Sequence, residues 1–286
     1  MFFNKLYNKL MELYTIKDNI IYIHDKSQFN PKHILECGQV FRFGKDDDGN
    51  YFVISSDKKA KIIETSSNYE IHSNNPNYFV NYFDLNTDYT KIKNELKKNA
   101  VLKPMIEYGY GIRILKADPE EMIYSFTISQ NNNISRIKKI VERLSEIGSP
   151  CDGYHAFPTS NQLKSQPFEF FKSIGAGYRD KYLKSIADSL SMVNFDEMKK
   201  LETDQLYNEL LKLNGVGPKV ASCILLFGFG RTEKFPVDTW LEQVYYNHFS
   251  KEKRTRPQIQ EYFENKFKQY SGIAQQYLFY FEREKI

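Results

Sequence analysis

Lys219 and Asp238 are the residues whose types and surroundings best suit them to chemistry. Lys219 lies in the segment LNGVGPKVA, and Asp238 lies further along the chain in the segment FPVDTW. Gly215 and Gly217 allow a tight backbone turn, and Pro218 suits the first position of a helix. Amides exposed at the start of a helix bind phosphate and disfavour a protonated amine nearby. Lys219 is therefore a candidate nucleophile, with Asp238 as its carboxylate partner.

The same two residues also have a passive interpretation. Glycine turns of this kind occur in proteins that only bind DNA, where Lys219 would contact a phosphate and Asp238 would cap a helix. Taken alone, the turn does not decide between catalysis and binding.

Composition limits the class of protein. The chain has 286 residues, 41% of them hydrophobic, which is enough for a sizeable core. Its formal charge of +4 is compatible with a polyanionic partner without requiring one. No apolar run approaches the roughly 18 residues of a membrane span, and the start MFFNK reaches charge too early for a signal peptide. We therefore expect a protein of the cytoplasm.

The three cysteines, Cys37, Cys151 and Cys223, are isolated and lack the spacing of a metal-binding motif. Neither a disulfide framework nor a structural zinc is indicated. We expect no metal and no cofactor.

The elements that must position these residues divide the chain in two. Alternating β-type segments separated by turns occupy residues 20–23, 40–43, 51–54 and 61–64. After Pro76, apolar residues recur at helical spacing. The pattern predicts an α+β fold with an N-terminal antiparallel β-sheet domain at 1–110 and a larger helical domain at 111–286. The apolar positions expected to face the core include Ile92, Leu96, Ile123, Phe126, Ile137, Ile140, Val141, Leu144, Leu206, Leu210, Leu211, Leu213, Val220, Ile224 and Leu225.

The segment around Lys219 resembles the helix-hairpin-helix element of base-excision DNA glycosylases. Together with the Pro-Val-Asp that ends at Asp238, it is similar to the 8-oxoguanine DNA glycosylase family. No cysteine follows Cys223, which sets the chain apart from the branches that carry a C-terminal iron–sulfur cluster. The resemblance implies that the N-terminal domain contributes to the lesion pocket and that a C-terminal helix completes it.

The resemblance assigns four residues to the lesion base. Gly38 lies in CGQVFR, where its carbonyl would accept from the N7 hydrogen of 8-oxoguanine and repel the N7 acceptor of guanine. Gln275 and Phe279 share one helical face, as an amide for the Watson–Crick edge and a ring for stacking. Cys223, one turn after Lys219, would form the other wall. Without the family, Gly38 would be a strand bend, Phe279 a core aromatic and Cys223 a small buried thiol.

Two further motifs imply contacts with the duplex. NNNISR matches the family's asparagine corner, so that Asn131 and Arg136 would fill the hole left by the extruded base and read the orphan cytosine. In GAGYR, Tyr178 would wedge into the base stack and Arg179 would share recognition of the orphan base. The alternatives are an asparagine-rich composition and a turn with a packed tyrosine and a surface arginine.

The hairpin amides of Gly215, Gly217 and Val220 would bind the DNA backbone. Trp240 departs from animal members, which commonly have histidine there, so no role is assigned to it. The resemblance implies a bifunctional glycosylase and AP lyase acting on double-stranded DNA with 8-oxoguanine opposite cytosine. It further implies a monomer of a bacterial type that acts on the chromosome in the cytoplasm. A monofunctional alkylbase glycosylase and a non-catalytic protein that binds distorted DNA remain alternatives.

Overall fold

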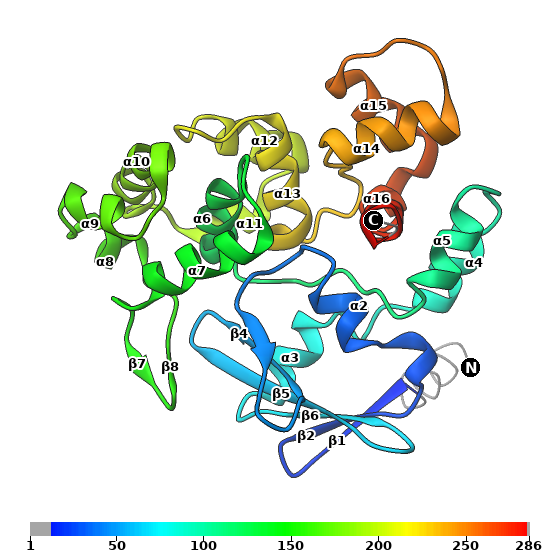
Figure 1. The fold of residues 1–286 in the computed structure, drawn as a ribbon, viewed down its shortest axis with the longest axis horizontal. Coiled ribbons are helices and arrows are strands. Elements are labelled where there is room, and N and C mark those ends of the chain that lie inside the picture. The colour runs from blue at the N-terminus through cyan, green and yellow to red at the C-terminus, as the bar shows by residue number, and fades with distance from the viewer. Residues whose placement is uncertain (1–12, 285–286) are drawn as a thin grey trace.

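The structure is a computed structural model and describes residues 13–284. Its N-terminal part contains a six-stranded sheet in the order β1-β2-β6-β5-β4-β3, with every neighbouring pair antiparallel (Figure 1). The predicted α+β class, an N-terminal antiparallel sheet followed by a mostly helical region, is confirmed. The strands are β1 (Tyr14–Lys17), β2 (Ile20–Ile23), β3 (Phe43–Lys45), β4 (Tyr51–Ser55), β5 (Lys58–Glu64) and β6 (Tyr69–His72).

One predicted strand begins later in the chain than expected. The segment 40–43 was expected to be a strand, but β3 begins only at Phe43. The preceding Gln39 explains the difference, because its buried amide donates to the carbonyl of Arg113 at 2.8 Å and accepts from the amide of Leu115 at 2.9 Å. These bonds fasten Gln39 to the linker that precedes the helical region, while the carbonyl of Arg42 still accepts from the amide of Ile54 in β4 at 2.8 Å.

Short helices accompany the sheet, so the N-terminal part is not purely β (Figure 1). Most begin with a proline in the first turn or an aspartate or asparagine cap, as the sequence pattern of helix starts favours. They are the 3-10 turn η1 (Lys26–Gln28), α2 (Pro31–Leu35), α3 (Pro76–Tyr82), α4 (Tyr89–Leu96) and α5 (Leu102–Tyr108).

Helices dominate the rest of the described chain. They are α6 (Pro119–Ser129), α7 (Ile134–Ser145), α8 (Ser160–Lys164), α9 (Phe168–Ser173), η2 (Gly177–Arg179), α10 (Asp180–Leu190), α11 (Phe195–Lys200), α12 (Thr203–Leu211), α13 (Pro218–Phe229), α14 (Thr239–Val244), the π-helical turn η3 (Tyr245–Phe249), α15 (Arg256–Phe267), η4 (Lys268–Tyr270) and α16 (Ser271–Glu284). A small hairpin of β7 (Pro150–Cys151) and β8 (Tyr154–His155) interrupts them.

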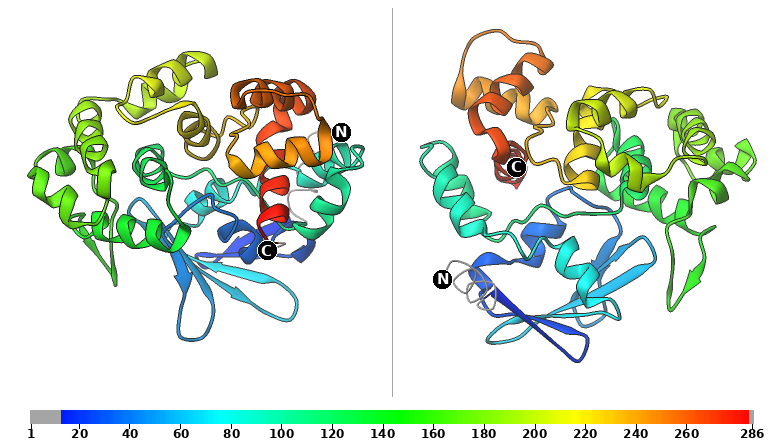
Figure 2. Two further views of the ribbon diagram at one scale, coloured as in Figure 1. Left: turned by 45° about the horizontal axis from the view of Figure 1, so that its top comes forward. Right: turned by 180° about the vertical axis from the view of Figure 1, so that it is seen from behind.

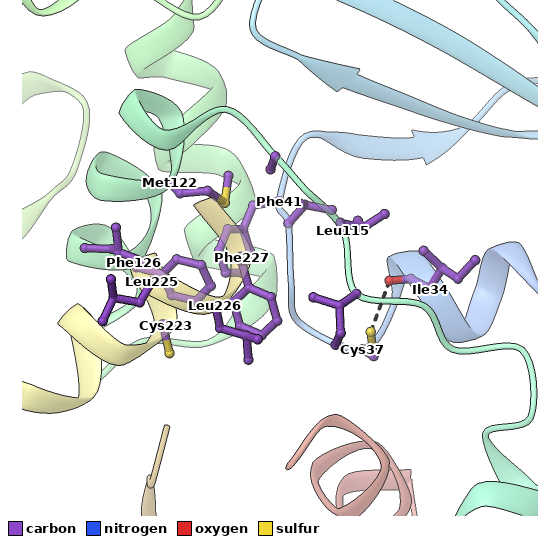
Figure 3. Packing of buried hydrophobic residues seen from close by; sticks show 14 of the residues in the cluster. Ile34, Cys37, Phe41, Leu115, Met122, Phe126, Cys223, Leu225, Leu226 and Phe227 are labelled. Carbon is purple, nitrogen blue, oxygen red and sulfur yellow. Dashed lines mark hydrogen bonds between the residues drawn. The ribbon is translucent and has the colours of Figure 1, made fainter. Parts of the chain in front are cut away.

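The core positions predicted from helical spacing are confirmed, except that Leu211 and Leu213 are only partly buried. The centre of the helical region is the packing of α6 on α13 (Figure 3). There the ring of Phe126 stacks on that of Phe227 with centroids 5.4 Å apart, and Phe41 from the segment before β3 meets Phe126 edge-on at 5.7 Å. Aromatic residues from both parts of the chain thus share one core.

The last described helix returns to the N-terminal part. α16 packs against α5 as well as against α14 and α15, as the two views in Figure 2 show. The predicted division near residue 110 stays a prediction. Among residues 13–284, no helix is long and apolar enough to cross a membrane. The expectation of no signal peptide concerns residues outside the described range.

Candidate active site

The glycine turn connects α12 to α13 as a helix-hairpin-helix. Gly217 is the N-cap of α13 and Pro218 its first residue, as the sequence predicted. Gly215 has φ +85°, and a Cβ atom there would lie 2.3 Å from the ring of Tyr182 in α10. Glycine is therefore required at 215 by both conformation and space. No atom of residues 13–284 lies within 4 Å of the corresponding position at Gly217, so the described chain leaves the N-terminus of α13 open at this point.

The Cys223 thiol interacts with two other candidate groups, the Lys219 amine and the Asp238 carboxylate. Burial raises the pKa of the Cys223 thiol, the neighbouring Lys219 amine opposes that rise through charge and hydrogen bonding, and the Asp238 carboxylate adds to it. The amine also lies 5.7 Å from the centre of the Phe126 ring. The structure thus brings the predicted nucleophile, carboxylate and pocket thiol together over the aromatic core.

Asp238 is also a helix cap. Its Oδ1 accepts a hydrogen bond of 3.0 Å from the amide of Leu241 at the start of α14. A carboxylate has several acceptor positions, so this bond leaves capacity for a second partner. The capping interpretation and the catalytic one are therefore compatible. Trp240 lies in the same helix and packs partly against the core.

The predicted lesion pocket brings the segment before β3 together with α16. Gly38 has φ +84°, and a Cβ there would be 3.3 Å from the ring of Phe279. Gln275, one turn earlier on α16, is 6% exposed, and its Oε1 has no hydrogen-bond partner within residues 13–284. A buried unpaired acceptor is costly, which makes it a natural partner for a ligand's donor.

Two side chains of α16 that sequence reasoning did not single out hold this glycine. Gln276 donates from Nε2 to the carbonyl of Cys37 at 2.5 Å, and Arg283 donates from Nη2 to the carbonyl of Glu36. The signal available in the sequence was spacing, because Arg283 follows Phe279 by one turn on the face that carries Gln275.

Asn131, Arg136, Tyr178 and Arg179 meet where α6 ends and η2 begins. Asn131 has φ +44° and is exposed. Arg136 is also exposed and donates to the carbonyl of Gly175 at 3.3 Å. Tyr178 is 52% exposed and donates to the carbonyl of Gln130 at 3.4 Å. We call these four predicted residues the corner. It begins just beyond the C-terminus of α6, the helix that carries Phe126.

Arg179 differs from its neighbours in the corner. It is 3% exposed, and its guanidinium donates to the carbonyls of Ala176 at 3.0 Å, Asn131 at 2.9 Å and Gln130. Its donors are occupied by backbone, so the residue supports the Asn131 turn. Its direct reading of an orphan base stays a prediction.

The helix-hairpin-helix with a lysine in its second helix and an aspartate beside it defines a class, the base-excision DNA glycosylases. Residues 124–269 match the model of the HhH-GPD superfamily of base excision DNA repair proteins. Residues 21–123 match the 8-oxoguanine DNA glycosylase N-terminal domain. The chain belongs to the 8-oxoguanine DNA glycosylase family.

Similar proteins agree with this placement. An 8-oxoguanine glycosylase/lyase from Clostridium acetobutylicum, solved with DNA containing cytosine opposite 8-oxoguanine, is 36% identical, with a TM-score of 0.89 over 95% of this chain and 98% of that one. The N-glycosylase/DNA lyase OGG1 of Arabidopsis thaliana is 32% identical over 201 residues, and the yeast N-glycosylase/DNA lyase 29% over 263. These matches span 64% and 77% of this chain, but only 55% of the plant protein and 68% of the yeast protein.

Proposed function

We propose that this protein is a bifunctional DNA glycosylase and AP lyase that removes 8-oxoguanine from double-stranded DNA. The observation that carries the proposal is the lysine at the first turn of α13, beside Asp238 and Cys223 and over the ring of Phe126. A glycosylase that used water alone would need the carboxylate but not this amine.

The proposed chemistry has two steps. The unprotonated Nζ of Lys219 attacks C1′ of the extruded nucleotide, the bond from C1′ to the base breaks, and the base leaves with a proton. Asp238 stabilises the positive charge that develops on the sugar. One proton of the amine goes to the leaving base and the other to O4′ as the sugar ring opens, which leaves Nζ and C1′ joined as a Schiff base. Loss of a 2′ proton then expels the 3′ phosphate, and water releases Lys219 from the cleaved strand.

Recognition of the base is proposed for Gly38, Cys223, Gln275 and Phe279. The approach of Gly38 to the Phe279 ring supports a pocket in which a backbone carbonyl and a stacking surface meet the same base. The unpaired Oε1 of Gln275 can accept from the N–H groups on the Watson–Crick edge of a guanine-type base. The N7 hydrogen, which 8-oxoguanine has and guanine lacks, would donate to Gly38.

Binding of the duplex is proposed for the hairpin and the corner. The amides of Gly215, Gly217 and Val220 would hold phosphates at the open N-terminus of α13, which fixes position and not sequence. The exposed Asn131, Arg136 and Tyr178 would occupy the space of the extruded base and contact its orphan partner, with cytosine preferred.

The protein would act as a monomer, since every side chain of the proposed site comes from one copy of the chain. Because its substrate is chromosomal DNA, we place its action in the bacterial cytoplasm.

Borohydride trapping on duplex DNA with 8-oxoguanine opposite cytosine tests the proposal. Reduction of the Schiff base attaches wild-type protein covalently to DNA, whereas a monofunctional glycosylase and a passive DNA-binding protein give no adduct. Lys219→Gln should abolish base release and trapping and keep binding to an abasic-site analogue. Lys200→Gln, which removes an exposed amine on α11, is the matched control and should trap like wild type. Trapping that persists in Lys219→Gln would contradict the assignment of the nucleophile.

A further inference from the structure

The turn that carries Gly38 is tied to α16 through two successive carbonyls. Arg283 donates to the carbonyl of Glu36, and Gln276 donates to the carbonyl of Cys37. The next carbonyl along the chain, that of Gly38, receives no hydrogen bond from any residue between 13 and 284. The two hydrogen bonds therefore hold the two carbonyls that immediately precede the Gly38 carbonyl, which would accept from the base.

Glycine cannot fix this carbonyl by itself. Its backbone adopts positive and negative φ almost equally well, so φ +84° at Gly38 is not maintained by local preference. To accept from the N7 hydrogen of 8-oxoguanine, the Gly38 carbonyl oxygen must lie within a few tenths of an ångström of the right place. The orientation must therefore come from outside the turn: α16 supplies it on the N-terminal side of Gly38, and the bonds of Gln39 to Arg113 and Leu115 fix the other side.

Arg283 also contacts the other half of the pocket. Its guanidinium lies 5.5 Å from the centre of the Phe279 ring, and its Nη1 is 3.6 Å from where a Cβ of Gly38 would be. That Nη1 is buried and has no partner within the described chain. One side chain thus touches the stacking ring, the reading glycine and the carbonyl at the start of its turn.

We propose that Arg283 is a positioning residue that sets the Gly38 carbonyl and the Phe279 ring at the spacing required by 8-oxoguanine. Gln276 assists by holding the carbonyl of Cys37, the residue before Gly38. The inference rests on the proposed function, and it adds a residue that acts on base recognition without acting on the sugar. Loss of Arg283 should therefore impair removal of the base and spare cleavage at a site from which the base is already absent.

The test compares two single-turnover rates in the full-length protein: base release from duplex with 8-oxoguanine opposite cytosine, and strand cleavage at an abasic site in the same duplex. Arg283→Met keeps much of the side-chain volume and removes the donors. It should slow base release roughly tenfold or more, the size expected for loss of a charged hydrogen bond. Cleavage at the abasic site should stay within about twofold of wild type. Arg283→Lys, which keeps a charge and a donor, should recover part of the loss.

Arg231→Met is the matched control. Arg231 also donates to two backbone carbonyls, those of Lys199 and Leu201, but at the far end of α13 from Lys219. It should lower the thermal midpoint and leave the ratio of the two rates unchanged. Gln276→Leu removes the second tie and should shift the ratio in the same direction as Arg283→Met, which keeps the proposal testable if the arginine variant folds poorly.

Equal losses in both rates for the Arg283 and Gln276 variants, or no loss in either, would overturn the positioning role alone. Wild-type protein that cleaves abasic sites but releases no 8-oxoguanine would overturn the proposed function and this inference with it.

Discussion

The proposed lesion pocket and the corner are built in opposite ways. In the pocket, donors of α16 are bound to the carbonyls of Glu36 and Cys37, while the acceptors Oε1 of Gln275 and the Gly38 carbonyl are left open. In the corner the side chains proposed to meet DNA are exposed, and within residues 13–284 the Arg136 side chain makes a single hydrogen bond, of 3.3 Å to the carbonyl of Gly175.

The difference separates two kinds of recognition. A pocket that offers fixed acceptors can distinguish bases by a single hydrogen, because its geometry exists before the base enters. An exposed corner can follow whatever partner remains in the duplex, at the cost of ordering its side chains on binding. We therefore expect substitutions in the pocket to change which base is removed, and substitutions in the corner to change which opposite base is tolerated.

Asp238→Asn provides the reference, since it acts at the sugar and belongs to neither region. It should slow base release by roughly 10²–10³-fold, the range for removing one stabilising group of a charged transition state. The loss should be the same opposite all four bases, because the sugar is common to them. The amide keeps the cap on Leu241, so the thermal midpoint should change little. Rates near wild type would reduce Asp238 to a structural cap.

Gly38→Ala should have the largest effect on the pocket. The added Cβ would lie 3.3 Å from the Phe279 ring at a backbone φ of +84°. Strain at such a φ costs about 1–2 kcal/mol, which corresponds to a loss of roughly tenfold in base release. Binding to an abasic-site analogue should be unaffected because no base occupies the pocket, and a parallel loss of that binding would place Gly38 outside base recognition.

Arg136→Ala tests the corner. We expect roughly tenfold slower release opposite cytosine and little change opposite adenine, because two acceptors of the orphan cytosine lose a guanidinium partner at about 1–3 kcal/mol. Single-turnover rates opposite each of the four bases measure it. A uniform decrease across the four would indicate that Arg136 contacts phosphate instead.

Arg179→Lys should give the smallest change in opposite-base preference. The guanidinium donates to backbone carbonyls of Gln130, Asn131 and Ala176, and a lysine can replace only part of that set. We expect a lower thermal midpoint and a preference for cytosine reduced by less than in Arg136→Ala. An equal or larger loss of preference would show that Arg179 leaves these carbonyls to read the orphan base. The pocket and the corner would then differ less than the structure without DNA indicates.

Local patterns in the sequence predicted much of the fold. The glycine hairpin, the cap at Asp238 and the buried faces of α6, α7 and α13 follow from residue type and helical spacing, which act over a few residues. The strand expected at 40–43 was wrong because a distant contact, between Gln39 and the segment around Arg113, decides that backbone.

The site could be predicted only where a motif identified it. The approach of Gly38 to Phe279 joins opposite ends of the chain, and no local pattern indicates such a pairing. The burial of Arg179 depends on the carbonyls of Gln130 and Asn131, which follow α6, and of Ala176, which precedes η2; its local sequence does not reveal this. Helical spacing places Arg283 on the face that carries Gln275 and Phe279, but its proposed role follows only from its hydrogen bond to the carbonyl of Glu36.

Tyr182 contacts both the hairpin, at Gly215, and the corner, at Tyr178. The ring fills the space beside Gly215 and meets the ring of Tyr178 edge-on at 6.1 Å. The proposed grip on a phosphate and the proposed wedge between bases therefore share one rigid support, so the number of nucleotides between them is set by the protein. A duplex in which the stack opens at any other step along the strand would not satisfy both contacts at once.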